Sequence, residues 1–210
     1  VAFAAEEPYS VGETWAYAHE GAVPMRAPDF TVVGERVREV VAVKGEGDEK
    51  RWMVQEKWGA EDDRASQRAI NAERLVDRIV AENGQVAIKP AYPYDFLDLK
   101  VDEEKGYEST FSFGENWTIP LKLKVKRGKD ESIQVPAGEY ADCTKLEFEE
   151  QVTFTPQNGN AVTIVTKRQV WLHASVNGMV KEISTIQGPD GEGRTGTSVL
   201  KKYSKEKSQS

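Results

Sequence analysis

Few residues in this chain have the types and spacing that catalysis by a metal or a nucleophile requires. The two histidines, His19 and His173, lie far apart in the sequence, and Cys143 is the single cysteine. A protein zinc site takes three or four closely spaced histidine, cysteine or carboxylate ligands. The hydrolase signature G-x-S-x-G and the phosphate-loop signature G-x-x-x-x-G-K-[ST] are absent as well. We therefore predict no metal site and no cofactor.

Carboxylates remain as possible catalysts. The 35 aspartates and glutamates could supply the pair of carboxyl groups that a glycoside hydrolase uses, but their spacing selects no particular pair. The glycine-rich run "GPDGEGRTG" (188–196) is typical of a hairpin loop. Cys143 falls inside an expected strand, where it would pack as a small apolar residue. We expect a non-catalytic protein with no catalytic residues, and a hydrolase with a carboxylate pair is one alternative.

The net charge and the short apolar runs argue against a nucleic-acid-binding protein and against a membrane-spanning helix. The formal net charge of the 210 residues is −7. A protein of this sign repels phosphate backbones, so nucleic acid is not expected as a partner. No run approaches the roughly 18 apolar residues that a membrane-spanning helix needs, so no transmembrane segment is predicted.

The first ten residues, "VAFAAEEPYS", indicate export. Ala2, Phe3 and Ala4 form the small-x-small pattern found at the end of a signal peptide, and an acidic, proline-containing stretch follows. We interpret residues 1–4 as the remnant of such a signal, with the mature chain starting near Ala5. The protein would then work in the periplasm or outside the cell. An ordinary alanine-rich terminus is the alternative.

Most of the remaining chain alternates apolar and polar residues with the period of a β-strand. In "PLKLKVKRGK", for example, apolar residues alternate with Lys122, Lys124 and Lys126. Residues 71–83 are ambiguous, because Leu75 and Ile79 also have helical spacing. Residues 204–210 are polar and are expected to form a flexible tail.

The phrase S-x-G-E-x-W occurs twice, in "YSVGETWAY" (Tyr9–Tyr17) and "FSFGENWTI" (Phe111–Ile119). We interpret the echo as an old duplication that gives two similar β halves, 5–108 and 109–203, within one domain. Each glycine would allow a bend, and Trp15 and Trp117 would be equivalent anchors in the core. The alternative is that the phrase is a common way to begin a strand.

Two further segments resemble a known group of proteins. They are "VPAGEYADCTKLEFE" (Val135–Glu149) and "VWLHASVNGMVKEI" (Val170–Ile183). They are similar to the signature V-P-A-G-T-F…W-Y-A-P-G-V-G-L-V-K-E of functionally uncharacterised, exported bacterial β proteins, many of them lipoproteins. This chain departs from it at Glu139 and Tyr140 and in the turn before Gly178. The resemblance implies a half-barrel like that of periplasmic lipoprotein carriers, and it brings no catalytic residues.

Together these observations predict a mostly all-β fold. We expect a strongly curved antiparallel sheet or half-barrel of about ten strands, built from two similar halves and with at most a short helix.

We interpret the protein as a non-catalytic component of the cell envelope that binds an apolar or lipid-like ligand in the concave face of this sheet. Tyr92, Tyr94 and Phe96 lie in the loop "AYPYDFL", which would cover the ligand, and Trp171 would contact it. An envelope structural or assembly protein that acts through protein contacts is the alternative. The lysines at 122, 124 and 126 either protect a sheet edge or contact an anionic surface.

Overall fold

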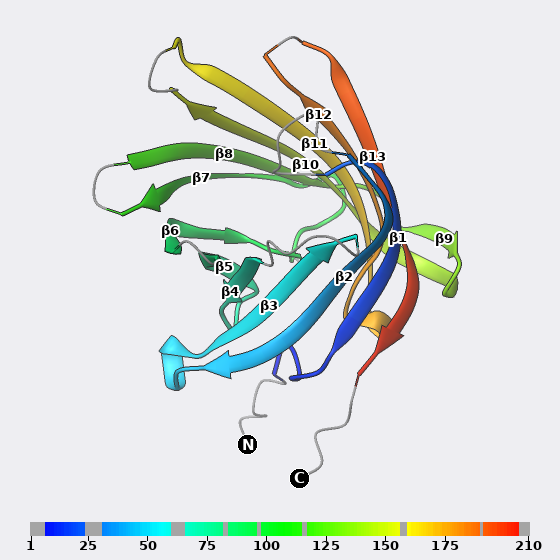
Figure 1. The fold of residues 1–210 in the computed structure, drawn as a ribbon. Helices are drawn as coiled ribbons and strands as arrows, with labels where there is room; N and C mark the ends of the chain where they lie inside the picture. Colours follow the sequence, from blue (N-terminus) through cyan, green and yellow to red (C-terminus); the bar gives the residue numbers. More distant parts are fainter. Residues whose placement is uncertain are drawn as a thin grey trace.

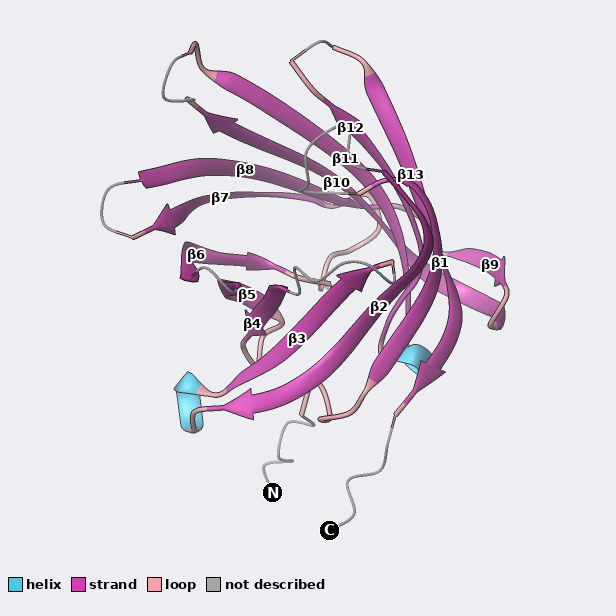
Figure 2. Ribbon diagram, in the orientation of Figure 1, coloured by secondary structure: helices cyan, strands magenta, loops and turns pink. Residues whose placement is uncertain are grey.

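The computed structural model describes residues 7–23, 31–59, 66–81, 84–95, 98–114, 117–155, 159–189 and 191–205 (Figure 1). Strands dominate these ranges. In chain order they are β1 (Thr14–Ala22), β2 (Thr31–Lys44), β3 (Arg51–Trp58), β4 (Ser66–Ile70), β5 (Leu75–Ala81), β6 (Gly84–Pro93), β7 (Glu104–Phe113), β8 (Trp117–Arg127), β9 (Glu131–Val135), β10 (Gly138–Phe154), β11 (Val162–His173), β12 (Gly178–Gln187) and β13 (Gly193–Ser204). Two single-turn 3-10 helices, Gly47–Glu49 and Ala174–Val176, are the only helical segments among the described residues (Figure 2). Neither approaches the length and apolar content of a membrane-spanning helix. The all-β prediction is confirmed.

The strands form a closed antiparallel barrel. The hydrogen-bonded order runs β11-β12-β13-β1-β2-β3-β4-β5-β6-β7-β8-β10, and β10 then pairs with β11 from Thr144–Leu172 to Phe154–Val162. Strand β9 pairs only with the first part of β10 and projects from the barrel (Figure 1). The expected strongly curved antiparallel sheet is confirmed. It differs in detail from the expected half-barrel of about ten strands, because the sheet closes on itself and contains more strands. Because β10 is 17 residues long, its second part can pair on both sides and close the sheet.

Side chains alternate between the lumen and the outer surface along these strands. In β8 the apolar side chains of Leu121, Leu123 and Val125 are buried, and the lysines between them are exposed. Strand β8 is paired with β7 on one side and β10 on the other. The interpretation that its lysines protect a sheet edge is therefore wrong.

The ambiguous segment 71–83 contains strand β5. The register of β5 shifts between Val76 and Arg78, so an extra residue is accommodated there. This irregularity explains the helix-like spacing, because Val76 lies in the core and Ile79, three residues later, packs against it. Asp77, beside this irregularity, accepts a hydrogen bond from Arg51 Nε at 2.5 Å.

The first copy of the repeated phrase fills one end of the lumen. Glu13 is fully buried, and its Oε1 accepts hydrogen bonds from Tyr203 Oη at 2.7 Å and Asn177 Nδ2 at 2.9 Å. Trp15 Nε1 donates to the carbonyl oxygen of Val176 at 2.7 Å. Tyr9 packs edge-on against Trp15 with 6.1 Å between ring centroids. We define the plug as the five side chains of Tyr9, Glu13, Trp15, Asn177 and Tyr203. The plug holds the amino-terminal phrase against the turn that precedes β12.

The second copy of the phrase has a different environment. Trp117 is 51% exposed and stacks on Phe113 of the preceding strand, with 4.6 Å between ring centroids, whereas Trp15 is 4% exposed. The two tryptophans are therefore not equivalent core anchors, and that prediction is wrong. Gly12 and Gly114 do share positive φ angles of 84° and 68°, as a bend requires. The interpretation of the echo as a duplication therefore loses its main support. The division into two halves between residues 108 and 109 stays a prediction, and this boundary falls within β7.

The two tryptophans make a matched pair for a stability measurement. We expect Trp15→Ala to lower the free energy of unfolding by about 3–5 kcal/mol, because it leaves a cavity and an unpaired carbonyl in the plug. Trp117→Ala should change it by less than about 1 kcal/mol, because the ring is half exposed. Urea unfolding followed by circular dichroism measures both. Equal losses in the two variants would contradict the assignment of Trp15 alone to the core.

Candidate binding site

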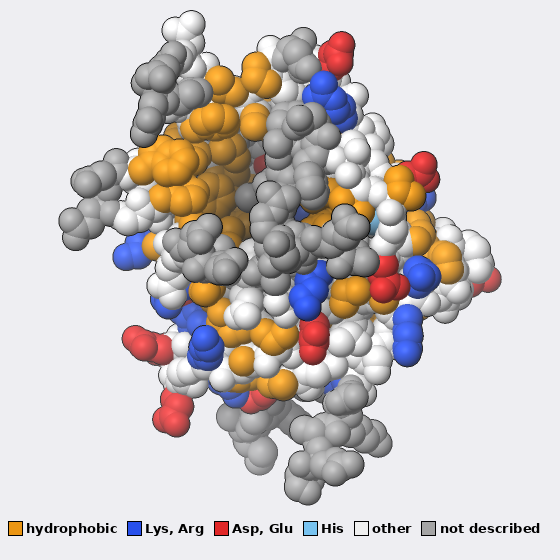
Figure 3. Space-filling view, viewed as in Figure 1, with side chains coloured by type: hydrophobic (Ala, Val, Ile, Leu, Met, Phe, Trp, Pro, Cys, Tyr) orange, Lys and Arg blue, Asp and Glu red, His pale blue; other side chains and the backbone are white. Residues whose placement is uncertain are grey.

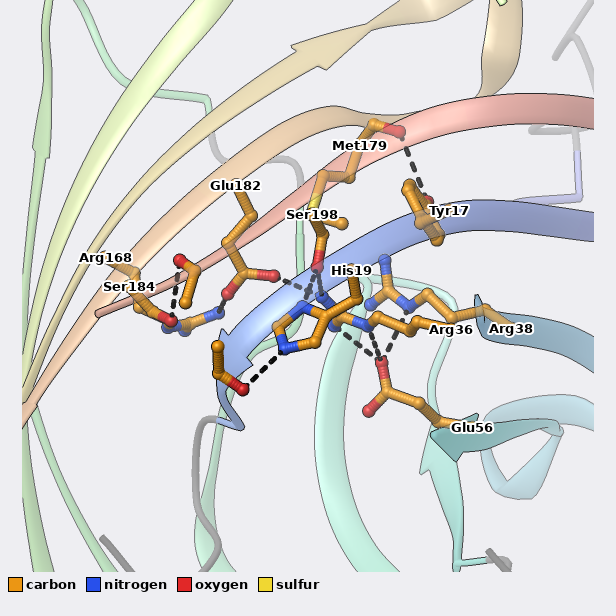
Figure 4. A network of polar contacts seen from close by, with 12 residues as sticks. Tyr17, His19, Arg36, Arg38, Glu56, Arg168, Met179, Glu182, Ser184 and Ser198 are labelled. Carbon is orange, nitrogen blue, oxygen red and sulfur yellow. Dashed lines mark hydrogen bonds and ion pairs between the residues drawn. The ribbon is translucent and has the colours of Figure 1, made fainter. Parts of the chain in front are cut away.

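Charged side chains cross the middle of the barrel lumen. Figure 4 shows Arg36 and Arg38 from β2, Glu56 from β3, Arg168 from β11 and Glu182 from β12 pointing toward one another. Strands β4 and β10 add Arg68 and Glu150. We call the complete set the ion belt: Arg36, Arg38, Glu56, Arg68, Glu150, Arg168 and Glu182.

Glu56 lies at the centre of one half of the ion belt. Its Oε1 is 2.6 Å from Arg36 Nη2 and 3.5 Å from Arg38 Nε, and its Oε2 accepts a hydrogen bond from Arg68 Nη1 at 2.5 Å. Its side chain is only 3% exposed. A buried carboxylate is tolerated when charged donors surround it in this way.

Glu182 joins the two halves of the ion belt. It pairs with Arg36 and lies 3.5 Å from Arg168 Nη1, and Arg168 also pairs with Glu150. Strands β2 and β12, which do not pair with each other, are linked through the lumen by these contacts (Figure 4).

Glu56 and Glu182 are kept in their charged form by their arginine partners. Burial raises the pKa of Glu56, but attraction to Arg36, Arg68 and Arg38 outweighs burial and holds the pKa well below its usual value. Burial likewise raises the pKa of Glu182, and attraction to its arginines lowers it below the usual value.

His19 borders the belt as a neutral neighbour. Its Nδ1 lies 2.9 Å from the hydroxyl of Ser198, to which Arg36 Nη1 also donates at 3.2 Å. Burial lowers the pKa of His19, and the positive charge of Arg36 acts in the same direction.

A small polar cavity of about 40 Å³ lies within the ion belt. The belt residues line it together with Trp58, Tyr92, Pro93 and Tyr94. The guanidinium of Arg36 lies over the ring of Trp58 at 4.2 Å, and that of Arg38 over the ring of Tyr94 at 4.5 Å. Aromatic faces therefore share the stabilisation of the buried cations.

The lumen beyond the ion belt is apolar. Past Glu150 the inward positions of β10 are Val152 and Phe154, which pair in register with Ile164 and Val162 of β11. The hairpin of β7 and β8 adds Phe113 and Trp117, whose exposed fractions are 37% and 51%. We call this set the apolar mouth: Phe113, Trp117, Val152, Phe154, Val162 and Ile164. Figure 3 shows hydrophobic side chains gathered over the ends of β7, β8 and β10.

The structure brings together two of the four predicted ligand-contacting residues. Tyr92, near the end of β6, and Tyr94, which directly follows β6, both line the polar cavity. Phe96 lies outside the described residues. Trp171 faces away from the lumen and lies against β9, where its Nε1 donates to Glu131 Oε2 at 2.8 Å. It is therefore not brought together with the two tyrosines.

The predicted anion-contacting lysines face outward beside glutamates. Lys122 Nζ lies 3.8 Å from Glu108 Oε1. Lys124 and Lys126 are in register with Glu149 and Glu147 and line a hollow of about 540 Å³ on the outer face, together with both glutamates. The alternation of signs makes this surface close to neutral, and contact with an anionic surface stays a prediction.

Sequence reasoning missed the ion belt. The stretch "TVVGERVREVVAVK" is rich in valine, which suggests that the valines face inward and the charges outward. Instead Arg36 and Arg38 occupy the inward positions in phase with Val40, and the register then shifts between Val40 and Ala42. The alternation of Arg36 and Arg38 with Val40 could have indicated that the two arginines face inward. Their partners could not be identified from the sequence, because they lie on strands far along the chain.

Candidate metal ligands are not grouped in the described part of the chain. No three histidine, cysteine, aspartate or glutamate residues there lie close enough to hold a metal ion. Cys143 is fully buried, and burial raises the pKa of its thiol, which disfavours the reactive thiolate. It packs in the core beside Ile133 and Val135 of β9.

Removing one carboxylate of the ion belt should destabilise the barrel strongly. We expect Glu182→Ala to lower the free energy of unfolding by about 3–5 kcal/mol, because Arg36 and Arg168 lose a buried partner. Glu149→Ala is the matched control on the outer face. Its partner Lys167 is 3.7 Å away and both side chains are exposed, so a change of no more than about 1 kcal/mol is expected. Similar losses in urea titrations of both variants would show that the belt is not a buried charge network.

Acidification should lower stability. The folded-state pKa values of Glu56, Glu182 and His19 all lie below their unfolded values, so the folded protein binds fewer protons than the unfolded chain. His19 makes its full contribution to the free energy of unfolding above about pH 6.5, and the two glutamates make theirs above about pH 4.3. Each contribution is lost as the pH falls through the folded-state pKa of that group. Urea unfolding at pH 7, 5.5 and 4 should show this decline. His19→Gln should reduce the part of the decline between pH 7 and 5.5, and a stability that rises on acidification would contradict the assignment.

Comparison with known proteins places the barrel among solved folds. No protein-family model and no curated protein matches the sequence. The structure is similar to the crystal structure of a predicted exported protein with a YmcC-like fold from Bacteroides fragilis, with a TM-score of 0.54. The match covers 94% of this chain and 98% of that chain at 14% sequence identity. At this identity the comparison establishes a shared fold.

Proposed function

We propose that the protein is exported and binds an apolar or lipid-like ligand at the apolar mouth without catalysing a reaction. The observation that carries this proposal is the set of large apolar side chains that face the lumen and stay partly exposed at one end. Soluble proteins seldom leave contiguous apolar surface of this kind uncovered, and ligand sites are typically concave and apolar. The opposite end of the lumen is filled by the plug, so a ligand would enter from the mouth.

Two observations support export. The pattern Ala2-Phe3-Ala4 resembles the end of a signal peptide. The Bacteroides fragilis protein that shares the fold is described as a predicted exported protein. The periplasm or the extracellular space would be the place of action.

A protein partner in the cell envelope is the second candidate. Phe113 and Trp117 stack on each other in a hairpin at the edge of the mouth, and both are partly exposed. Exposed aromatic pairs are frequent at protein interfaces. In this case the mouth would bind a side chain or strand of another protein.

Binding of the apolar probe N-phenyl-1-naphthylamine tests the first candidate. We expect its fluorescence to rise on addition of the protein, and the double substitution Phe113→Glu with Trp117→Glu to weaken binding about tenfold or more, because two apolar contacts are lost. Val33→Glu is the matched control: Val33 is 83% exposed and lies on β2, away from the mouth hairpin, so binding should not change.

Native mass spectrometry of the protein purified from the periplasm completes the test. A retained small molecule that is lost in the double variant supports ligand binding. A clean mass for the unmodified chain, together with no response of the probe, would exclude the proposed ligand site. Co-purification of a defined envelope protein that depends on Trp117 would favour the second candidate.

A further inference from the structure

The polar cavity within the ion belt has an excess of positive charge. Its described lining contains four arginines (Arg36, Arg38, Arg68 and Arg168) and three glutamates (Glu56, Glu150 and Glu182), which gives 4 − 3 = +1. Burial of an uncompensated charge costs several kcal/mol. The belt thus has one cation more than its own carboxylates neutralise.

Hydrogen-bond donors on the cavity wall are also left without acceptors. Arg168 Nε and the hydroxyl of Tyr94 are buried and have no hydrogen-bond partner among the described residues. Arg38 Nε also makes no hydrogen bond there, although it forms a long ion pair with Glu56 Oε1 at 3.5 Å. All three residues line the cavity, and Arg38 is 8% exposed. Leaving a buried donor unsatisfied costs about 1–3 kcal/mol. What the cavity lacks is therefore an acceptor, and the charge balance favours an anionic one.

The size of the cavity restricts the anion. One water molecule occupies roughly 10–15 Å³ in a cavity of this kind, so about 40 Å³ accommodates about three small atoms. A carboxylate has three heavy atoms. A lipid phosphate group has at least five and would not fit without expansion of the belt.

The cavity and the apolar mouth lie along the same strands, β10 and β11. On β10 the inward position after Glu150 is Val152, and on β11 the inward residues beyond Arg168 reach Ile164 and Val162. The distance from Arg168 to Val162, six residues further back along β11, is about 20 Å at the usual rise of a strand. A ligand with a small anionic head and a long apolar chain would match both parts.

We infer that the barrel binds a long-chain monocarboxylate, with its carboxylate in the polar cavity beside Arg38, Arg168 and Tyr94 and its hydrocarbon chain in the apolar mouth. The inference rests on the proposed function and adds the identity of the head group. Arg38 and Arg168 supply charge, and the hydroxyl of Tyr94 donates a hydrogen bond to a carboxylate oxygen.

Displacement of N-phenyl-1-naphthylamine at pH 7.5 by three ligands with the same chain tests the inference. We expect dodecanoate to displace the probe at a concentration about tenfold or more below that of dodecan-1-ol, since a hydrogen bond to a charged group contributes at least that factor. Dodecyl phosphate should bind more weakly than dodecanoate because of its size. Equal displacement by the acid and the alcohol, or tighter binding of the phosphate, would overturn the inference and leave the proposed function intact. If none of the three displaces the probe and the probe itself does not bind, the proposed function fails as well.

Two substitutions locate the head group. Tyr94→Phe removes only an unpaired hydroxyl and should fold normally, and we expect it to weaken dodecanoate binding about tenfold without changing the affinity for dodecan-1-ol. Arg38→Met should likewise lower the ratio of the affinity for dodecanoate to the affinity for dodecan-1-ol. Tyr140→Phe is the matched control, because Tyr140 lies on the hairpin of β9 and β10 and is absent from the cavity lining. An unchanged ratio in both Tyr94→Phe and Arg38→Met would contradict a carboxylate in this cavity.

Discussion

The neutralisation of buried charge inside the barrel is the constraint on which the rest of the structure depends. Arg36 on β2 reaches Glu182 on β12, 146 residues further along the chain. Because strand side chains alternate with period two, a slip of one residue in any strand of the belt would turn its charge out of the lumen and leave a partner unpaired. The ion belt therefore selects one register for β2, β3 and β4 relative to β10, β11 and β12.

The lumen is organised as three layers with different chemistry. The plug uses fully satisfied hydrogen bonds around Glu13 and closes one end. The ion belt occupies the middle and leaves a few donors unsatisfied, and the apolar mouth is incompletely covered. Polarity thus changes along a single axis, which is the arrangement that an amphipathic molecule would complement.

The features that depend on one strand at a time could be predicted from the sequence. Period-two alternation gave β8 correctly, and the glycines at 12 and 114 adopt the expected positive φ. Features that depend on partners far along the chain could not. The closure of the barrel depends on the second pairing partner of β10, and the inward placement of Arg36 depends on Glu182. The similar phrases around Trp15 and Trp117 led to the wrong prediction of equivalent core anchors. The same residues begin a strand in both places, but different neighbours surround the two tryptophans.

The pairing of the first strand with the last has a consequence for how the chain folds. Thr14 of β1 is opposite Ser204 of β13, so closure joins positions at nearly the full length of the chain. Contacts of such long range slow folding, because the entropy of a very large loop is lost before the contacts form. During synthesis the barrel cannot close until β13 has emerged from the ribosome. Until then the cations of β2 lack Glu182, and β1 presents an unpaired edge to other chains.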